Sequence, residues 1–524
     1  MAMYLNQNGN QFRKYLKNKI FVDKSLIIRE CNDVFGSENS FMCVTRPRRF
    51  GKSLTFSMLN AYYSKGCDSR ELFKDLAISK DPSFEEHLNK HNVFCIDMNS
   101  LYSNLLDKNE FVSILRSSIL SDLKETYPSI DFSDCKLLSM AFSKVKAAYD
   151  DRFIFLIDEW DEVYREEEHN TKLCDEYTDF LRGLFKAGDV ASNIDLVYMT
   201  GILPIRRYNT QSTLNMFTEY NMLKSRGLSS FFGFTEDEVK GLCRKYNADF
   251  PAIKNWYDGY RLGGVEIYNP KSVVEAVLEG ECGDYWVSTS ATEAITNYMN
   301  FDKGALKASI ARMLTGEKAK LDVTEFGNDL TKVDSQDAAL CVLIHLGYLA
   351  YDPETKSCYI PNHEIAVEFK RAMKKLKWKS VFLPMDNSDE LLEKTFAGDA
   401  SFIDEAMDLN HEDLANIFNK NKEDVLGIVV YLSYFSAREH YEVRKEETST
   451  LGRADLSFVP FEAGHPPFIV ELKVGKSPDE ALSQIKARRY WRAWKRYKGK
   501  VLLVGIAYDP STLKHASKIE WIEI

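Results

Sequence analysis

Two short apolar runs, each followed closely by residues that bind phosphate or metal in other proteins, constrain the fold of this chain most strongly. The first is Phe41–Thr45, which leads into a loop ending in Gly51-Lys52-Ser53 and then into an expected helix from Leu54 to Tyr63. The second is Phe153–Ile157, which ends in Asp158-Glu159. Runs this short and apolar are typical of central strands in a parallel sheet, because helices cover both faces of such a sheet.

Two further runs extend the same pattern. Val93–Met98 and Ile194–Met199 are strand-like and alternate with helical stretches across the first two hundred residues. Strands that alternate with helices favour parallel pairing, since a crossover helix must return the chain to the same edge of the sheet. The chain is therefore predicted to have an α/β fold with a doubly wound parallel sheet.

The loop before the first of these helices is predicted to bind the phosphates of ATP. Backbone N–H groups at a helix N-terminus attract anions, and a Gly-Lys-Ser sequence places a cation and a hydroxyl beside them. Lys52 is expected to reach the β and γ phosphates and Ser53 to bind Mg²⁺, with Arg49, Gly51 and Leu54 completing the nucleotide contacts. Arg46 stands where the first glycine of the common pattern is expected, so the backbone of this loop should be more restricted.

The acidic and polar strand ends supply the remaining parts of an ATP site. Asp158 is expected to hold Mg²⁺, and Glu159 to orient or deprotonate the water that attacks the γ-phosphate. Thr200, at the end of the run from Ile194, is a candidate sensor of the γ-phosphate. Arg206 and Arg207 follow shortly and are candidates for an arginine finger toward a neighbouring copy. The alternative is an α/β domain that retains these motifs without binding a nucleotide.

A second chemical centre lies near the carboxyl end. Fifteen residues separate Asp455 from Glu471, which follows the apolar run Phe468–Val470 and precedes Leu472-Lys473. Because side chains alternate along a strand, Glu471 and Lys473 share one face. Two carboxylates can hold one or two Mg²⁺ or Mn²⁺ ions, and a lysine can orient the attacking water. The three residues therefore predict metal-dependent phosphodiester hydrolysis, with ordinary exposed charges on a hairpin as the alternative.

The residues around this centre predict contact with nucleic acid. Glu446 is preferred over Glu447 as a further metal carboxylate, and the helix expected from Pro478 carries Gln484. Residues 486–500 contain eight basic residues, no acidic residue and four aromatic residues. Basic side chains neutralise phosphates, while aromatic rings either stack on unpaired bases or pack the helix down. The predicted nucleic-acid contacts are Gln484, Arg488, Arg489 and Arg492, and DNA is favoured over RNA as the partner.

The charge distribution agrees with a localised nucleic-acid contact. The whole chain has a formal net charge of −10, yet residues 441–524 contain fifteen Lys and Arg against eleven Asp and Glu. Overall acidity argues against indiscriminate coating of nucleic acid. Positive charge is instead concentrated beside the predicted cutting site.

Both centres resemble known families. Asp455, Glu471 and Lys473 resemble the metal carboxylates and catalytic lysine of the PD-(D/E)XK nuclease superfamily. Several motifs in the first 270 residues are similar to those of the bacterial AAA-ATPase-like family. These motifs are Phe21-Val22-Asp23-Lys24-Ser25, Arg46 to Ser53, Leu156-Ile157-Asp158-Glu159, Thr200-Gly201-Ile202, and Trp256-Tyr257-Asp258-Gly259-Tyr260 with Tyr268-Asn269-Pro270. Members of that family typically pair the ATPase region with a carboxyl-terminal PD-(D/E)XK domain, and their loop before Gly-Lys-Ser is itself rich in arginine.

The resemblance implies a P-loop NTPase (AAA-like) sheet, a helical lid or adaptor region, and a C-terminal α/β restriction-endonuclease-like domain. The chain of 524 residues is too long for one core, and we expect the ATPase core at residues 1–228, the lid or adaptor at 229–386 and the nuclease-like domain at 387–524. An AAA-like core also makes self-association into a homo-oligomer an expectation. ATP and Mg²⁺ or Mn²⁺ are the expected cofactors.

Cysteine usage and hydropathy set the expected compartment. Ten cysteines are scattered without C-x-x-C pairs or finger-like Cys/His spacing. No apolar run approaches the roughly 18 to 20 residues that span a bilayer. We therefore expect a cytoplasmic protein with no membrane segment and no structural zinc.

The motifs together predict an ATP-regulated, Mg²⁺-dependent nucleic-acid hydrolase. One alternative is a nucleotide-dependent switch or scaffold whose nuclease fold binds nucleic acid or protein without cutting. A second alternative is an ATP-driven motor on DNA for which cleavage is secondary. The altered phosphate loop and the lack of recognisable helicase motifs count against the motor.

Overall fold

The computed structural model describes most of the chain and divides it into two compact units. The described residues are 3–167, 169–186, 192–205, 207–208, 211–212, 214–286, 295–299, 305–324, 333, 335–418, 422–449, 452–461, 464–494 and 499–524. Unit 1 contains Met1–Ala248, Gly259–Glu279 and Leu321–Cys358, whereas unit 2 contains Asp249–Asp258, Gly280–Lys320 and Tyr359–Ile524. The three-part division expected from the sequence, with boundaries after residues 228 and 386, stays a prediction.

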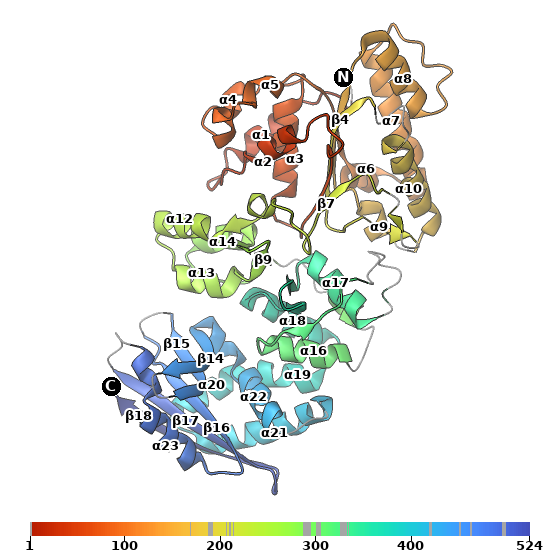
Figure 1. Cartoon of the computed structure of the whole chain (residues 1–524). Coiled ribbons are helices and arrows are strands. Elements are labelled where there is room, and N and C mark those ends of the chain that lie inside the picture. The colour runs from red at the N-terminus through yellow and green to blue at the C-terminus, as the bar shows by residue number, and fades with distance from the viewer. Residues whose placement is uncertain are drawn as a thin grey trace. The chain divides into compact units, whose positions relative to one another are not determined.

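A parallel sheet with the strand order β2-β3-β4-β1-β7 forms the centre of unit 1 (Figure 1). Its strands are β1 (Phe41–Thr45), β2 (Asn92–Asp97), β3 (Phe153–Asp158), β4 (Ile194–Gly201) and β7 (Thr218–Tyr220). The four strands predicted from apolar runs are confirmed to within two residues at each end. The predicted α/β fold with a parallel sheet is thereby confirmed.

Helices cover both faces of this sheet, and successive side chains of a strand point alternately into the two cores that these helices form. Ile154 and Leu156 of β3 pack into one core, and Phe153, Phe155 and Ile157 pack into the other. The first core is built on α1 (Asn10–Tyr15), α2 (Ile27–Asp33), α3 (Lys52–Tyr63), α4 (Arg70–Phe73) and α5 (Phe84–His87). The second is built on α6 (Met98–Asn104), α7 (Phe111–Thr126), α8 (Leu138–Tyr149), α9 (Glu162–Glu166) and α10 (Thr171–Phe185).

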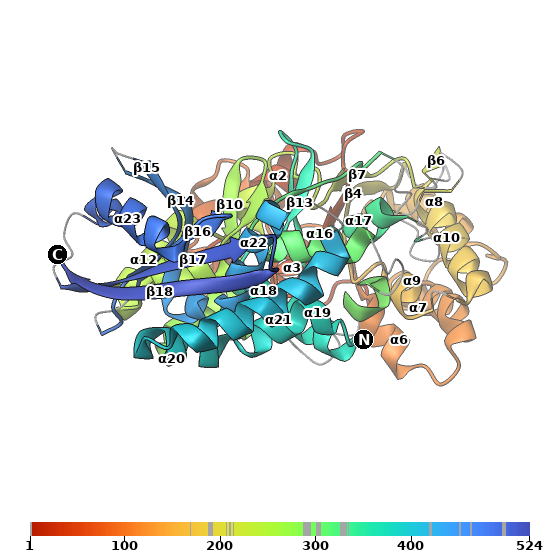
Figure 2. The ribbon, with the colours of Figure 1, turned by 90° about the horizontal axis from the view of Figure 1, so that it is seen from below.

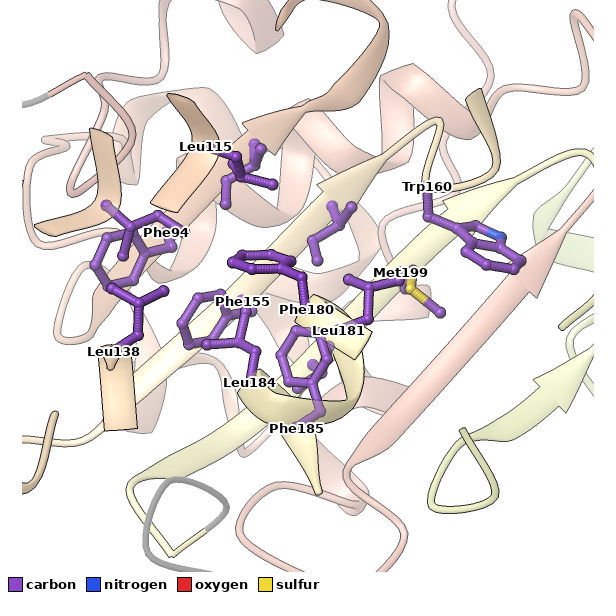
Figure 3. Packing of buried hydrophobic residues seen from close by; sticks show 14 of the residues in the cluster. Phe94, Leu115, Leu138, Phe155, Trp160, Phe180, Leu181, Leu184, Phe185 and Met199 are labelled. Carbon is purple, nitrogen blue, oxygen red and sulfur yellow. The ribbon is translucent and has the colours of Figure 1, made fainter. Parts of the chain in front are cut away.

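The second core is rich in aromatic rings. Figure 3 shows Phe155 of β3 facing Phe180, Leu184 and Phe185 of α10, while Trp160 lies beside Met199 of β4. The rings of Phe155 and Phe185 meet edge to face, with their centroids 5.5 Å apart. This packing fixes the end of β3, where the acidic residues lie.

The remainder of unit 1 is a smaller set of helices and strands. A three-stranded antiparallel sheet has the order β8-β10-β9. Its strands and the nearby elements are β8 (Phe234–Thr235), β9 (Tyr260–Leu262), β10 (Val265–Tyr268), α12 (Glu236–Tyr246), α14 (Pro270–Glu279), α17 (Gln336–Leu346) and β12 (Ala350–Asp352). Thr235 and Glu238 begin α12 with a capping box, which satisfies two backbone donors at the helix start.

Unit 2 combines a layer of helices with a five-stranded mixed sheet (Figure 1). The helices are α13 (Phe250–Tyr257), α16 (Ala305–Leu314), α18 (His363–Lys375), α19 (Lys379–Asp386), α20 (Ser388–Ala397), α21 (Ala400–Phe418) and α22 (Lys422–Ser433). The sheet has the order β14 (Tyr441–Ser449), β15 (Gly452–Pro460), β16 (Phe468–Val474), β17 (Lys500–Asp509) and β18 (Lys514–Glu523). Only β16 and β17 pair in parallel among these described neighbours.

The two faces of the mixed sheet carry different residues of β16. Ile469 packs with Leu482 and Ile485 of α23 (Pro478–Arg488), whereas Phe468 contacts the ring of Phe396 in α20. On the helical side, β18 runs alongside α21 (Figure 2). Glu471 and Lys473 follow Ile469 at alternate positions and therefore face α23.

No helix in the described part of the chain combines the length and the apolar character needed to cross a bilayer.

Candidate nucleotide site and metal site

The carboxyl ends of β1, β3 and β4 meet at one edge of the parallel sheet, where a cavity of about 970 Å³ opens. The loop after β1 enters α3 through Gly51, whose φ of 89° lies in the left-handed region that favours glycine. The cavity wall includes the five residues predicted as nucleotide contacts from this loop and helix, together with Glu159 from the end of β3. Those five are Arg49, Gly51, Lys52, Ser53 and Leu54.

Lys52 is held at the base of the phosphate loop. Its side chain is buried, and Nζ donates hydrogen bonds to the carbonyl oxygens of Arg46 and Pro47, each at 3.0 Å. Glu159 Oε1 lies 4.0 Å from the same nitrogen. Burial lowers the pKa of Lys52, although Glu159 and Asp158 oppose that change. An ammonium that is held only by carbonyl oxygens and a nearby carboxylate can exchange these acceptors for phosphate oxygens.

Asp158 and Ser53, the predicted Mg²⁺ ligands, contact one another near Lys52. The Asp158 carboxyl is buried, and burial, reinforced by the charge of Glu159, raises its pKa to about 7. A hydrogen bond with the Ser53 hydroxyl and the charge of Lys52 oppose this rise. A carboxylate and a hydroxyl that are paired in this way match the oxygen ligands that Mg²⁺ takes in phosphate sites.

Two of the predicted contacts, Asp158 and Thr200, do not line the cavity. Thr200 lies in β4. Its hydroxyl is buried and donates a 2.8 Å hydrogen bond to the carbonyl of Val44 in β1. The arginine-finger candidates cannot be placed, because Arg206 and the side chain of Arg207 lie outside the described residues.

Arg46 has a structural role that the sequence did not indicate. Its buried guanidinium donates to the carbonyls of Thr45 at 2.8 Å and of Tyr220 at 2.9 Å, and it lies 5.3 Å from the ring centre of Phe232. Tyr220 belongs to β7, so Arg46 links the two neighbouring strands β1 and β7. Burial lowers the pKa of Arg46 to about 10, which leaves it charged at neutral pH.

Positive charge dominates the cavity wall. Seven lysine and arginine residues line it against two glutamates, and the cations are Lys19, Lys24, Arg48, Arg49, Lys52, Arg165 and Lys271. Lys24 donates to both carboxylate oxygens of Glu238 and to the carbonyl of Ser230, at 2.6 to 2.7 Å, and so ties the amino-terminal segment to α12. Apolar side chains such as Phe21, Val274 and Leu278 also line the cavity. The wall therefore suits a ligand with a polyphosphate and a flat apolar group.

In unit 2, Asp455 and Glu471 are brought together where β15 and β16 separate. The described pairing of these strands ends at Leu456 and Val470. Beyond that point Asp455 Oδ2 accepts a 2.7 Å hydrogen bond from the backbone N–H of Leu472, the residue after Glu471. The carboxylate of Asp455 thereby replaces a bond of the strand ladder and lies beside Glu471.

Glu471 is a buried carboxylate whose two oxygens differ. Oε1 accepts hydrogen bonds from Lys473 Nζ at 2.9 Å and from Gln484 Nε2, while Oε2 has no hydrogen-bond partner in the part of the chain that the structure describes. The side chain is 1 % exposed. Burial and the charge of Asp455 raise its pKa to about 7, against the opposing effect of Lys473. A buried oxygen of this kind, beside a second carboxylate, fits a divalent cation.

Gln484 and Tyr490 support Glu471 from the α23 side. Gln484 Nε2 lies 2.9 Å from the Tyr490 hydroxyl as well as within hydrogen-bond reach of Glu471. Tyr490 and Trp494 are buried in the core under α23, so these two rings pack inward. The predicted nucleic-acid contacts Arg488, Arg489 and Arg492 are exposed beside them.

The structure describes Glu446, the predicted further metal carboxylate, only by the position of its backbone in β14. Lys445 pairs with Leu456 and Glu447 pairs with Ala454, so Glu446 occupies the register position opposite Asp455. Its side chain lies outside the described residues. Its proposed role as a further metal ligand stays a prediction.

Two family models match this chain. Residues 10–210 match the family described as predicted AAA-ATPase, and residues 421–518 match the PD-(D/E)XK nuclease superfamily. The family resemblance is thus confirmed for the motifs within these two ranges, while those at Trp256–Tyr260 and Tyr268–Pro270 lie outside both. The mixed sheet of unit 2 is consistent with a PD-(D/E)XK domain. A curated relative from Azotobacter chroococcum mcd 1, an "uncharacterized protein in vnfD 5'region", is 22 % identical over 486 residues, which cover 89 % of each chain.

Proposed function

We propose that the protein is an ATP-binding, ATP-regulated nucleic-acid hydrolase that cleaves phosphodiester bonds with Mg²⁺ or Mn²⁺. The observation that carries the proposal is the buried carboxylate of Glu471 beside the half-buried Asp455, with an unpartnered Glu471 oxygen among the described residues and Lys473 at 2.9 Å. Burying a carboxylate costs free energy that an ordinary surface charge does not incur. Such a cost is typical of a site that binds a cation.

Asp455, Glu471 and Lys473 have separate roles in the proposed reaction. A bound divalent cation supplies charge neutralisation at the phosphate and a more acidic water. Asp455 and Glu471 would hold that cation, with Glu446 as a further proposed ligand. Lys473 orients the attacking water and balances the negative charge that develops on the phosphate. Gln484 fixes the rotamer of Glu471 by its hydrogen bond.

The cavity of unit 1 would bind ATP. Lys52 contacts the β and γ phosphates, Ser53 and Asp158 bind Mg²⁺, and Glu159 orients the water that attacks the γ-phosphate. Thr200 remains a proposed sensor of the γ-phosphate that would act through β1, since its hydroxyl bonds to Val44. Nucleotide occupancy is proposed to regulate cleavage, and the pairing of an ATPase region with a nuclease region in one chain supports that link.

DNA is the favoured substrate, with Arg488, Arg489 and Arg492 as backbone contacts next to the cutting site. These side chains are exposed, and no acidic residue lies between positions 486 and 500. Self-association through the ATPase region is proposed from the family resemblance.

A nucleotide-dependent switch or scaffold is the second candidate, and one observation favours it. Glu471 Oε1 is already paired with Lys473 and Gln484, and Asp455 Oδ2 accepts a backbone N–H group. These bonds would let the site serve as a stable binding surface without a cation.

Cleavage assays separate the two candidates. Wild type, Glu471→Ala and Lys52→Ala are incubated with plasmid, single-stranded DNA and RNA in Mg²⁺ or Mn²⁺, with and without ATP. Loss of cutting in Glu471→Ala with retained ATP hydrolysis supports the nuclease. Absence of cutting by wild type with every nucleotide and both metals contradicts it and favours the switch.

A further inference from the structure

Arg165 of α9 is a buried cation at the wall of the nucleotide cavity. Its side chain is 9 % exposed and is surrounded by three carboxylates. The guanidinium lies 2.6 Å from Glu159 Oε2, 2.5 Å from Glu162 Oε2 and 3.1 Å from Asp161 Oδ2. One side chain therefore connects the proposed water-orienting residue, Glu159, to the start of α9.

The three carboxylates are not equally free to release Arg165. Asp161 Oδ2 accepts backbone hydrogen bonds from Ile202 at 3.1 Å and Leu203 at 2.7 Å, and its side chain is completely buried. Glu162 accepts a 2.9 Å hydrogen bond from Asn99 and is also buried. Both acids are thus fixed by other parts of the fold.

Glu159 is the exchangeable partner. Its side chain is 20 % exposed and lines the cavity. Within the described residues its carboxylate contacts two cations, Arg165 at 2.6 Å and Lys52 at 4.0 Å. Its backbone adopts a φ of 50°, in the left-handed region that non-glycine residues rarely occupy, which turns the chain sharply after β3. The carboxylate can therefore separate from Arg165 without disturbing a helix or a strand.

We propose that Arg165 is a positioning residue that distinguishes nucleoside triphosphates from diphosphates. The guanidinium partitions between Glu159 and the terminal phosphate of a bound triphosphate, and Glu159 is released toward the attacking water when the phosphate takes its place. The inference rests on the proposed nucleotide binding and adds a regulatory step to it. Asp161 and Glu162 keep Arg165 at the cavity wall during the exchange.

The chemistry of arginine suits this exchange. A guanidinium presents five N–H donors in a planar fork, so it can keep two carboxylates while it moves a third contact from carboxylate to phosphate. A lysine has a single nitrogen and cannot hold the same set. A terminal phosphate carries more charge than one carboxylate and competes for the freed donors. A diphosphate lacks the competing group at that position, so Glu159 stays bound to Arg165.

The test measures ATP and ADP affinities in Mg²⁺ by titration calorimetry, for the full-length wild type and three variants. Arg165→Lys retains a positive charge but not the fork, and Glu162→Gln weakens a competing carboxylate that does not line the cavity. Arg182→Ala is the matched control, since Arg182 is exposed and pairs with Asp179 on the surface of α10. We expect the ratio of ATP to ADP affinity to fall about tenfold in Arg165→Lys and to rise about threefold in Glu162→Gln, with ADP affinity changing less than about threefold.

The outcomes test the role of Arg165 separately from the proposed binding of nucleotide. An unchanged ratio in Arg165→Lys, in a protein that melts at the wild-type temperature, overturns the role of Arg165 alone. A parallel loss of ATP and ADP affinity also overturns it, because that result indicates a structural role. Failure of wild type to bind either nucleotide removes the proposed function together with this inference.

Discussion

The two candidate sites balance their charges in opposite ways. Seven cations line the cavity of unit 1 against two glutamates. In unit 2, Glu471 has a neighbouring carboxylate in Asp455 and one cation in Lys473. A cation-rich cavity attracts a polyanion, whereas a pair of carboxylates attracts a divalent cation. The first site is therefore expected to respond to nucleotide and the second to metal.

The comparison also shows what a raised pKa can and cannot identify. Burial raises the pKa of Asp158 and of Glu471 alike, in each case to about 7. The two acids differ in their surroundings, because Asp158 bonds to Ser53 beside a buried lysine while Glu471 keeps one oxygen without a partner among the described residues. The neighbouring charges, and not the pKa alone, indicate the ligand.

The largest expected effect concerns Lys473 and tests whether the site in unit 2 performs chemistry. Lys473→Met keeps the length of the side chain and removes its charge, so cleavage should fall by about a hundredfold to a thousandfold. Initial rates on plasmid DNA in Mn²⁺ measure it. Lys476→Met is the control, because Lys476 is exposed just beyond the same strand. Equal rates in the two variants would remove Lys473 from the reaction.

A substitution of Lys52 provides the corresponding test of the nucleotide site in unit 1. Lys52→Ala removes a buried cation from the phosphate loop and should weaken ATP affinity by about tenfold to a hundredfold. Calorimetric titration of ATP measures the change, and the surface variant Lys74→Ala should bind as wild type does. Metal-dependent cutting without ATP should persist in Lys52→Ala. If that basal cutting disappears while the protein stays folded, the assignment of the two ligands to separate sites is wrong.

A smaller effect is expected on stability, and its sign follows from the pKa of Glu471. The folded protein binds the Glu471 proton more tightly than the unfolded chain, whose carboxyl titrates near 4.5. The buried charge therefore costs stability progressively as pH rises from about 4.5 to about 7, and the cost is fully present above that window. Glu471→Gln should be more stable than wild type at pH 8, on the order of 2 kcal/mol, and equal to it below pH 4.5.

Thermal melts at pH 4.5 and pH 8 measure this difference, with Glu523→Gln as an exposed control on β18. Mg²⁺ should raise the melting temperature of wild type at pH 8 more than at pH 6, because the cation competes with the proton. Glu471→Gln should lose that response. Parallel melts of wild type and Glu471→Gln at both pH values would show that Glu471 is not held as a costly buried acid.

Much of the fold could be predicted because apolar runs and strand ends are local features. The predicted strand from Phe41 to Thr45 matches β1 at both ends, and the capping residues of α12 and α23 mark their starts. The grouping of Lys52, Ser53 and Glu159 around one cavity followed from the meeting of parallel strand ends. These inferences need only periodicity and the geometry of a sheet.

Other parts of the sites depend on packing that a sequence does not display. Arg46 was expected only to stiffen the phosphate loop, yet it bonds to Tyr220, which is 174 residues away. The sequence did not predict a role for Arg165, because a single arginine in an acidic stretch usually forms an ion pair on the surface. In the structure three carboxylates enclose it at the cavity wall. Similarly, the pattern from residue 486 did not determine whether its rings stack on bases or pack inward. The burial of Tyr490 and Trp494 answers this for those two residues.

The smallest expected effect concerns the exposed arginines beside Glu471. With Tyr490 and Trp494 turned into the core, nucleic-acid binding there should depend mainly on charge. Arg489→Ala and Arg492→Ala should each weaken DNA binding by about threefold to tenfold and lower the slope of log affinity against log salt by about one. Fluorescence anisotropy at several salt concentrations measures both quantities, and Arg29→Ala, a surface variant in unit 1, should leave them unchanged. A slope that does not change would mean that DNA contacts another face of unit 2, and the charge contrast between the two sites would then hold for metal but not for nucleic acid.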